Sequence, residues 1–130
     1  MLKTYLAVML GGAAGTGVRM WLSTLLTLRY GEVFPVGTLV VNVTGSFVIG
    51  LFGGLTSPQG ALSASPLVRM VVMVGFLGGY TTFSSFSLQT LTLLNSGAWA
   101  RAGLNAMLSL LLCLWAVWLG HVLAGLLNPR

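Results

Sequence analysis

Glycine, hydroxyl and aromatic side chains interrupt a long apolar stretch in the segment GGYTTFSSFS, residues 78 to 87. Gly78 and Gly79 weaken a helix at this point, and Thr81 or Thr82 can cap its restart. Backbone carbonyls would then be exposed on one side of the break and N–H groups on the other. Carbonyls suit a hard cation, whereas the N-terminus of the new helix favours an anion. The segment therefore predicts a broken helix with an ion site of either sign.

Two phenylalanines share one helical face with two hydroxyls after this break. Phe83, Phe86, Ser87 and Thr90 stand at positions i, i+3, i+4 and i+7, which fall on one side of a helix. Core packing is the usual use of two phenylalanines at this spacing. Aromatic rings also carry a positive edge that can contact an anion. With hydroxyl and amide donors nearby, the face would equally form a path for a small anion that sheds its water.

A second apolar run carries a stripe of polar and then small residues at i+4 steps, formed by Thr38, Asn42, Ser46, Gly50 and Gly54. Polar groups are unfavourable in hydrocarbon, so this face is not expected to contact lipid. The hydroxyls can be explained by hydrogen bonds between or within helices. The asparagine, with two N–H donors, is equally suited to bind a ligand or to join helices.

Arg19 is a charged residue inside the first apolar run, and no acidic residue stands in any such run to pair with it. Its long side chain can reach the membrane surface by snorkelling. The alternative is that its positive charge attracts anions to the entrance of a pore. One turn before it, Gly11 and Gly15 form a small-xxx-small pair, which favours close packing of another helix.

The last apolar run repeats the polar spacing with Asn105, Ser109 and Cys113. Packing is the expected use of Cys113, because a free cysteine commonly behaves as a small buried hydrophobe. The chain has one histidine, one cysteine and one acidic residue, Glu32, which stands in a loop. A nucleophile, a base and an orienting group cannot be assembled from these, so the sequence does not predict an enzyme.

The elements that must position these groups follow from composition. Hydrophobic residues make up 56% of the 130 positions and charged residues 5%, which predicts an all-α integral membrane protein. Because about 20 apolar residues cross a bilayer, the chain predicts a single domain, 1–130, with four transmembrane helices. Their expected ranges are Tyr5–Leu28, Val36–Leu55, Leu67–Leu94 and Ala98–Leu127. The third, at about 28 residues, is longer than a straight crossing needs, and a break would absorb the excess.

The net charge of +5 does not indicate nucleic-acid binding, because the six basic residues are scattered singly along the chain. It bears instead on how the chain is oriented in the membrane. Four spans place both termini on one side of the membrane. Lys3, Arg69 and Arg130 then fall on the terminal side, against Arg29 and Arg101 opposite. This bias is weak under the positive-inside rule. It predicts insertion in both orientations, which would permit an antiparallel, dual-topology homodimer.

Three motifs together resemble the Fluc (CrcB) family of fluoride channels: GFLGGYTTFSSFS at 75–87, GTLVVNVTGSF at 37–47 and GGAAGTGVR at 11–19. The resemblance extends over the whole chain in length, span number and motif order. It implies an antiparallel homodimer of four-span subunits in a bacterial or archaeal cytoplasmic (inner) membrane. Such a dimer would export fluoride passively through two pores and hold a structural sodium ion at its centre.

The resemblance also implies roles for individual residues. The backbone carbonyls of Gly78 and Thr81, each supplied by both subunits, would bind the sodium ion. The residues implied in the fluoride pore are Phe83, Phe86, Asn42, Ser84, Ser87, Thr38, Ser109 and Arg19. At position 105 some members have a tyrosine, whereas this chain has Asn105, which leaves the outer part of the pore path undefined.

Two other classes of membrane protein have a similar composition. A small proton-coupled multidrug transporter is also a four-span, dual-topology dimer, but it needs a titratable carboxylate within the membrane, which this sequence does not provide. A structural subunit of a larger membrane complex needs only packing. The broken span with its hydroxyls and phenylalanines is more than packing requires, so the fluoride channel is the preferred interpretation.

Overall fold

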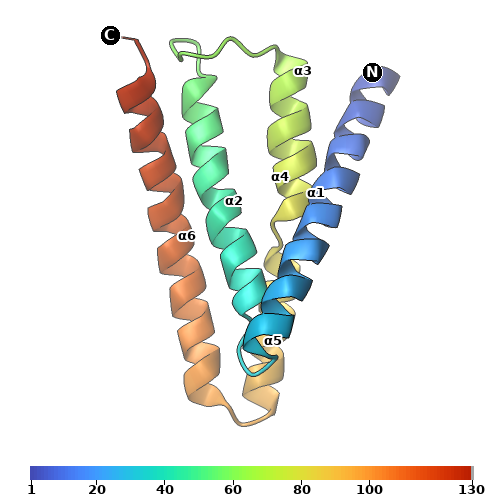
Figure 1. The fold of residues 1–130 in the computed structure, drawn as a ribbon, viewed down its shortest axis with the longest axis vertical. Coiled ribbons are helices and arrows are strands. Elements are labelled where there is room, and N and C mark those ends of the chain that lie inside the picture. The colour runs from blue at the N-terminus through green and yellow to red at the C-terminus, as the bar shows by residue number, and fades with distance from the viewer. Residues whose placement is uncertain (130) are drawn as a thin grey trace.

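The computed structural model describes residues 1–129 as helices joined by short connections. The elements are α1 (Leu2–Tyr30), α2 (Val36–Leu55), α3 (Pro66–Arg69), the π-helix η1 (Met70–Phe76), α4 (Leu77–Tyr80), α5 (Phe83–Asn95) and α6 (Trp99–Leu127). Within this described range there is no strand. The N-terminal end of α1 and the C-terminal end of α6 lie at the same end of the molecule (Figure 1). Arg130, counted above on the terminal side, lies outside the described residues.

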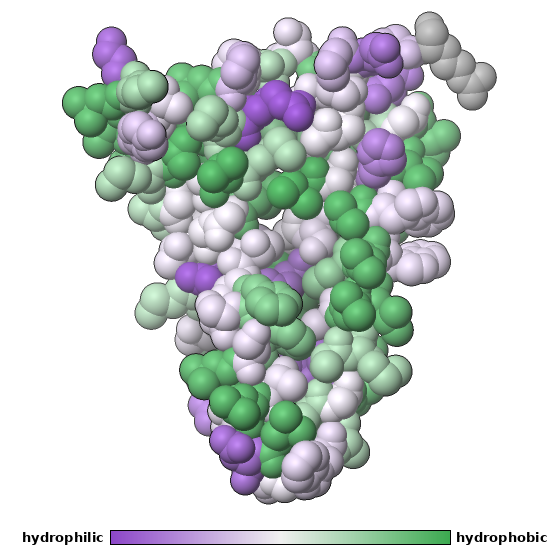
Figure 2. Space-filling model, turned by 180° about the vertical axis from the view of Figure 1, so that it is seen from behind, coloured by the Kyte–Doolittle hydropathy of each residue, from purple (hydrophilic) through white to green (hydrophobic). Residues whose placement is uncertain are grey.

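Among the described residues, three helical segments are long and apolar enough to cross a membrane: Val36–Leu55, Pro66–Asn95 and Trp99–Leu127. The middle segment takes α3 through α5 as one span. The predicted all-α membrane protein is therefore confirmed, and α2 has the predicted bounds. Figure 2 shows hydrophobic side chains over much of one face, with hydrophilic ones gathered mainly toward its ends. At 29 residues α1 is long enough to span, but it is not among the three apolar segments.

Small residues let α2 and α6 lie side by side along their length (Figure 1). A Cβ atom added to Gly50 would collide with the backbone of Val117, and one on Gly120 with the carbonyl of Phe47. Thr38 of the polar stripe is buried as well. The prediction that this stripe avoids lipid is confirmed where it meets α6, and backbone contact explains why glycine is needed there.

The first helix packs against η1 and α4 by the same device. A Cβ atom on Gly15 would collide with the carbonyl of Phe76, and one on Gly79 with the carbonyl of Gly12. The small-xxx-small pair of α1 therefore serves close helix packing, as predicted. Through this contact α1 supports α4 just before the chain leaves helical geometry.

Polar contacts tie the ends of the bundle together near the termini. The guanidinium of Arg69 donates to the carbonyl and the hydroxyl of Thr56, the C-cap of α2, with the hydroxyl contact at 2.6 Å. The side-chain amide of Asn128 donates to the carbonyl of Gly54 at 3.3 Å and accepts the N–H of Ala61 at 2.9 Å. These bonds satisfy carbonyls at a helix C-terminus, where cations are also favoured.

Two glycines of α1 allow a matched test of this packing. Gly15→Ala places a methyl group against the carbonyl of Phe76 and should destabilise the fold by about 1–3 kcal/mol. Gly17 has nothing within 4 Å of its Cβ position, so Gly17→Ala should be neutral or stabilising by up to roughly 1 kcal/mol. Thermal unfolding in detergent, followed by size-exclusion chromatography, measures both. Equal melting temperatures for the two variants would contradict the close contact.

Candidate functional site

The chain leaves helical geometry for two residues between α4 and α5. Thr81 has φ −83° and ψ 158°, and Thr82 has φ −153° and ψ 113°, so both are extended. Thr82 is the N-cap of α5, and its hydroxyl accepts the N–H of Ser85 at 3.2 Å. Of the two threonines predicted to cap the restart, the second therefore does so.

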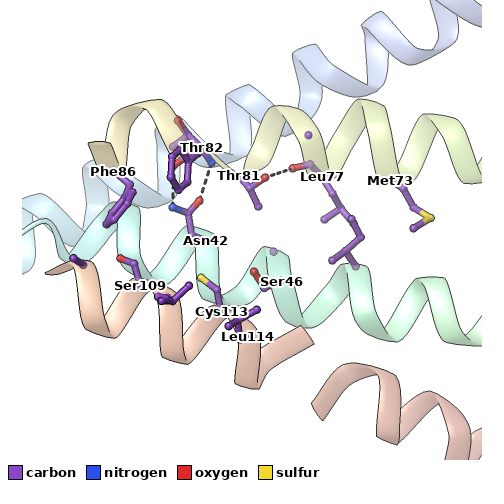
Figure 3. A pocket seen from close by; sticks show the side chains of 16 residues that line it. Asn42, Ser46, Met73, Leu77, Thr81, Thr82, Phe86, Ser109, Cys113 and Leu114 are labelled. Carbon is purple, nitrogen blue, oxygen red and sulfur yellow. Dashed lines mark hydrogen bonds between the residues drawn. The ribbon is translucent and has the colours of Figure 1, made fainter. Parts of the chain in front are cut away.

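Asn42 of α2 binds both backbone groups of the capping residue (Figure 3). The N–H of Thr82 donates to Asn42 Oδ1 at 2.7 Å, and Asn42 Nδ2 donates to the carbonyl of Thr82 at 3.0 Å. The side-chain amide thus replaces the partners that a regular helix would have supplied. One of the two Nδ2 hydrogens is used in this way, which leaves the other as a donor.

Two carbonyls at the interruption lack the N–H donors that a continuous helix would give them, because those N–H groups bond elsewhere. The N–H of Thr82 would bond to the carbonyl of Gly78 in a continuous helix, but it donates to Asn42 instead. The N–H of Ser85 would bond to the carbonyl of Thr81, but it donates to the hydroxyl of Thr82. Gly78 and Thr81 therefore lose their regular helical donors. Their carbonyl oxygens are the type of ligand that a hard cation prefers.

A cavity of about 590 Å³ lies beside the interruption, with walls from α2, η1, α4, α5 and α6. Figure 3 shows Asn42 and Ser46 on one helix, Ser109 and Cys113 on another, and Phe86 beyond Thr82. The cavity is mainly apolar, with a few amide and hydroxyl groups in its wall. The predicted site residues that it brings together are Asn42, Gly78, Thr81, Phe83, Phe86 and Ser109.

The two phenylalanines lie against each other at the start of α5. Their ring centroids are 5.3 Å apart and the ring planes are inclined by 52°. Phe83 is 79% exposed in the single chain, whereas Phe86 is half-buried. Packing within the core of one chain, which was the commoner use of this spacing, therefore does not describe Phe83.

Four predicted residues do not line this cavity. Ser87 donates its hydroxyl to the carbonyl of Phe83 at 2.9 Å, and Ser84 Oγ lies 3.3 Å from Thr82 Oγ1. Thr38 is buried within the bundle. Arg19 is half-exposed on α1, a helix that contributes nothing to the cavity wall.

One polar contact beside the cavity was not predicted from the sequence. The hydroxyls of Tyr80 and Thr44 lie 2.8 Å apart, and Tyr80 is buried. The ring of Tyr80 is stacked on Phe76 with centroids 6.2 Å apart. Thr44 lies off the i+4 stripe that drew attention to α2, so no spacing rule could have found this pair. It joins α2 to the last turn of α4, immediately before the interruption.

The fold and this cavity define a helical integral membrane protein with a mainly apolar cavity between its helices, in whose wall a few amide and hydroxyl groups lie. A sequence model described as "CrcB-like protein, Camphor Resistance (CrcB)" matches residues 6–121. The chain therefore belongs to the CrcB family, which confirms the resemblance seen in its motifs.

Relatives of high identity cover almost all of the chain. The "Fluoride-specific ion channel FluC" of Opitutus terrae is 58% identical over 127 residues, which span 98% of this chain and 96% of that protein. The protein of the same name from Rhodospirillum rubrum is 54% identical over 125 residues, 96% and 97% of the two chains. That of Methylocella silvestris is 49% identical over 124 residues, 95% of each chain.

Replacing Asn42 tests whether it holds the interruption in place. Asn42→Ala leaves the N–H and the carbonyl of Thr82 without these partners, which should cost about 1–3 kcal/mol for each group left unpaired. The amide hydrogen of Thr82 should then exchange faster with solvent, as measured by NMR on labelled protein. Ser46→Ala, one turn further along the same cavity wall, is the control and should preserve its protection. Unchanged exchange in Asn42→Ala would contradict the assignment.

Proposed function

We propose that this chain forms a fluoride-specific channel that exports the ion passively and so lowers its cytoplasmic concentration. The observation that carries the proposal is one cavity whose wall combines amide and hydroxyl groups with the side chains of two phenylalanines. Support also comes from relatives with that printed name, which match the chain over nearly its whole length. A channel of this kind is a conduit rather than an enzyme.

In the proposed mechanism, fluoride exchanges water for several weak contacts in turn. Asn42 offers its remaining N–H, and Ser109 offers a hydroxyl from the facing helix. Phe83 and Phe86 offer the positive edges of their rings, which attract an anion but hold water weakly. Several weak sites in series let an ion bind and still leave, as conduction requires.

Four further residues have roles beyond the cavity wall. Ser84 and Ser87 follow the two phenylalanines and would continue the hydroxyl track beside the pore. Thr38 is a polar neighbour one turn before Asn42 on α2. Arg19, in a helix that no acidic residue shares, would raise the local potential at the pore entrance.

The working unit in this proposal is an antiparallel homodimer of four-span subunits with two pores, in a bacterial or archaeal inner membrane. The interruption at Thr81 and Thr82 is the break of the third span, and α1 is the fourth crossing helix. A break of this kind is tolerated where protein covers it. The exposure of Phe83 in the single chain and the near balance of basic residues support a partner subunit in the opposite orientation.

A structural sodium ion at the dimer centre fits the donors at the interruption. Gly78 and Thr81 offer carbonyls without their regular helical donors, and two subunits would supply four such oxygens. Sodium, like other hard cations, prefers oxygen ligands. The ion would supply fixed positive charge between the two pores.

The rival interpretations need features of another kind. A proton-coupled multidrug transporter requires a carboxylate in its membrane pathway, whereas Glu32 lies between α1 and α2. A structural subunit of a larger complex would need neither the cavity nor its polar groups. Direct measurement of ion flux separates all three.

Fluoride efflux from liposomes holding the purified protein is the decisive measurement. A fluoride electrode should record rapid efflux, and a chloride electrode should record none in matched vesicles. Phe83→Ile removes an aromatic ring from the cavity wall and should abolish fluoride flux without dissociating the dimer. Phe52→Ile, on α2 away from the cavity wall, is the control and should conduct. Equal flux of both ions, or none of either, would overturn the proposal.

The sodium proposal predicts a dependence on that ion for assembly. Prolonged dialysis against a sodium-free buffer containing a large organic cation should dissociate the dimer or stop conduction, and sodium should restore both. Cross-linking yield and fluoride efflux measure the two effects separately. Dimers that form and conduct equally well without sodium would show that the carbonyls of Gly78 and Thr81 do not need it.

A further inference from the structure

The helix that carries the two phenylalanines has little apolar anchoring of its own. None of the thirteen residues of α5 is buried. Burial of an apolar face is what normally fixes a helix in place. Within one chain, polar contacts therefore contribute more than usual to the position of α5. At its first turn these contacts come from Asn42 through Thr82.

A second polar contact reaches α5 from α6 and ends on the backbone of Phe86. Asn105 Nδ2 donates to the hydroxyl of Thr90 at 2.8 Å, and that hydroxyl donates to the carbonyl of Phe86 at 2.8 Å. Asn105 is only 1% exposed, so its amide has no access to water in place of this contact. Hydrogen bonds in such a chain polarise and strengthen one another.

We propose that Asn105 and Thr90 are positioning residues that fix Phe86 in the cavity wall. The inference rests on the proposed channel function, because it concerns a ring assigned to the ion path. Neither residue lines the cavity itself. Thr90 stands one turn after Phe86 on α5 and bonds to its backbone carbonyl. Both residues therefore act on the ring through the backbone rather than by touching it.

The simpler interpretation is that this contact only holds α5 and α6 together. A second threonine of α5 provides a control for the positioning role. Thr92 has the same local geometry as Thr90, since its hydroxyl donates to the carbonyl of Leu88 at 2.9 Å. Thr92 is exposed, and its back-bond serves only its own helix. A difference between the two threonines therefore reports the contact from Asn105 and not the back-bond.

The test compares Thr90→Val, Thr90→Ser and Thr92→Val. Valine keeps the shape of threonine but removes the hydroxyl, whereas serine keeps the hydroxyl. Thr90→Val should lower fluoride efflux by about fivefold. The loss of one ordinary hydrogen bond would lower the ratio of correctly placed to displaced Phe86 rings by that factor. Thr90→Ser and Thr92→Val should stay near the parent protein. Asn105→Ala combined with Thr90→Val should be no worse than Thr90→Val alone.

A fluorine label makes the placement of the ring visible without reference to flux. With 4-fluorophenylalanine in place of Phe86, Thr90→Val should shift or broaden the ¹⁹F signal, and Thr90→Ser should restore it. The same label in place of Phe52 should be unaffected. If Asn105→Ala does not give a monodisperse protein, the Thr90 and Thr92 variants decide the question by themselves.

The outcomes keep this inference apart from the channel proposal. A parent protein that passes no fluoride would overturn the channel, while the label would still decide whether Thr90 positions Phe86. A conducting parent with the same flux and the same label signal in Thr90→Val would overturn the positioning role. Equal losses of fluoride efflux in Thr90→Val and Thr92→Val would do so as well. They would show that the loss comes from the hydrogen bond of each hydroxyl to its own helix and not from the contact with Asn105.

Discussion

The pairing of Asn42 with both backbone groups of Thr82 is the interaction on which the rest of the site depends. Backbone polar groups cannot be left unpaired in hydrocarbon, so a chain can leave helical geometry inside a membrane protein only where something else satisfies them. One side-chain amide does this from a neighbouring helix, at 2.7 and 3.0 Å. The irregular residues can then stay extended, and the carbonyls of Gly78 and Thr81 are left without their regular helical donors.

Close packing by small residues makes this interaction possible. The amide of Asn42 is short, so α2 must approach the interruption closely, and Gly45 of the same helix lies directly against Thr81 and Tyr80. On its other side α2 meets α6 through glycine contacts. The polar residues are thus fixed to a frame of backbones in contact, which is more rigid than side chains meeting through long apolar groups.

Much of the fold could be predicted because membrane insertion leaves few alternatives. The bounds of α2 follow from its apolar run, and a cap at Thr81 or Thr82 follows from hydroxyl chemistry. The partner of that cap could not be predicted, since 40 residues separate Asn42 from Thr82 and helical spacing describes only one helix at a time. The π-helix η1 was also beyond prediction. It changes the number of residues per turn within a run whose apolar residues fit an ordinary helix.

Helical spacing overestimated the polar face of α5 for a similar reason. Ser87 shares a face with Phe83 by position, yet its hydroxyl bonds back to the carbonyl of Phe83. A short hydroxyl can always satisfy itself on its own backbone in this way. Position on a helix therefore predicts where a side chain stands but not whether its donor is free. Asn42 differs because its amide reaches beyond its own helix.

In the proposed channel, the orientation of the Asn42 amide would decide whether it offers a donor or an acceptor to an ion. Thr82 presents an N–H and a carbonyl, so only one orientation pairs Oδ1 with the donor and Nδ2 with the acceptor. Rotation by 180° would place oxygen against oxygen and N–H against N–H. The unused Nδ2 hydrogen is therefore fixed as a donor, whereas a free amide could equally offer its oxygen. A donor held in place before the ion arrives favours an anion with little reorganisation. In the proposed channel, the bonds that close the backbone at the interruption would thus also give this part of the cavity wall a preference for negative charge.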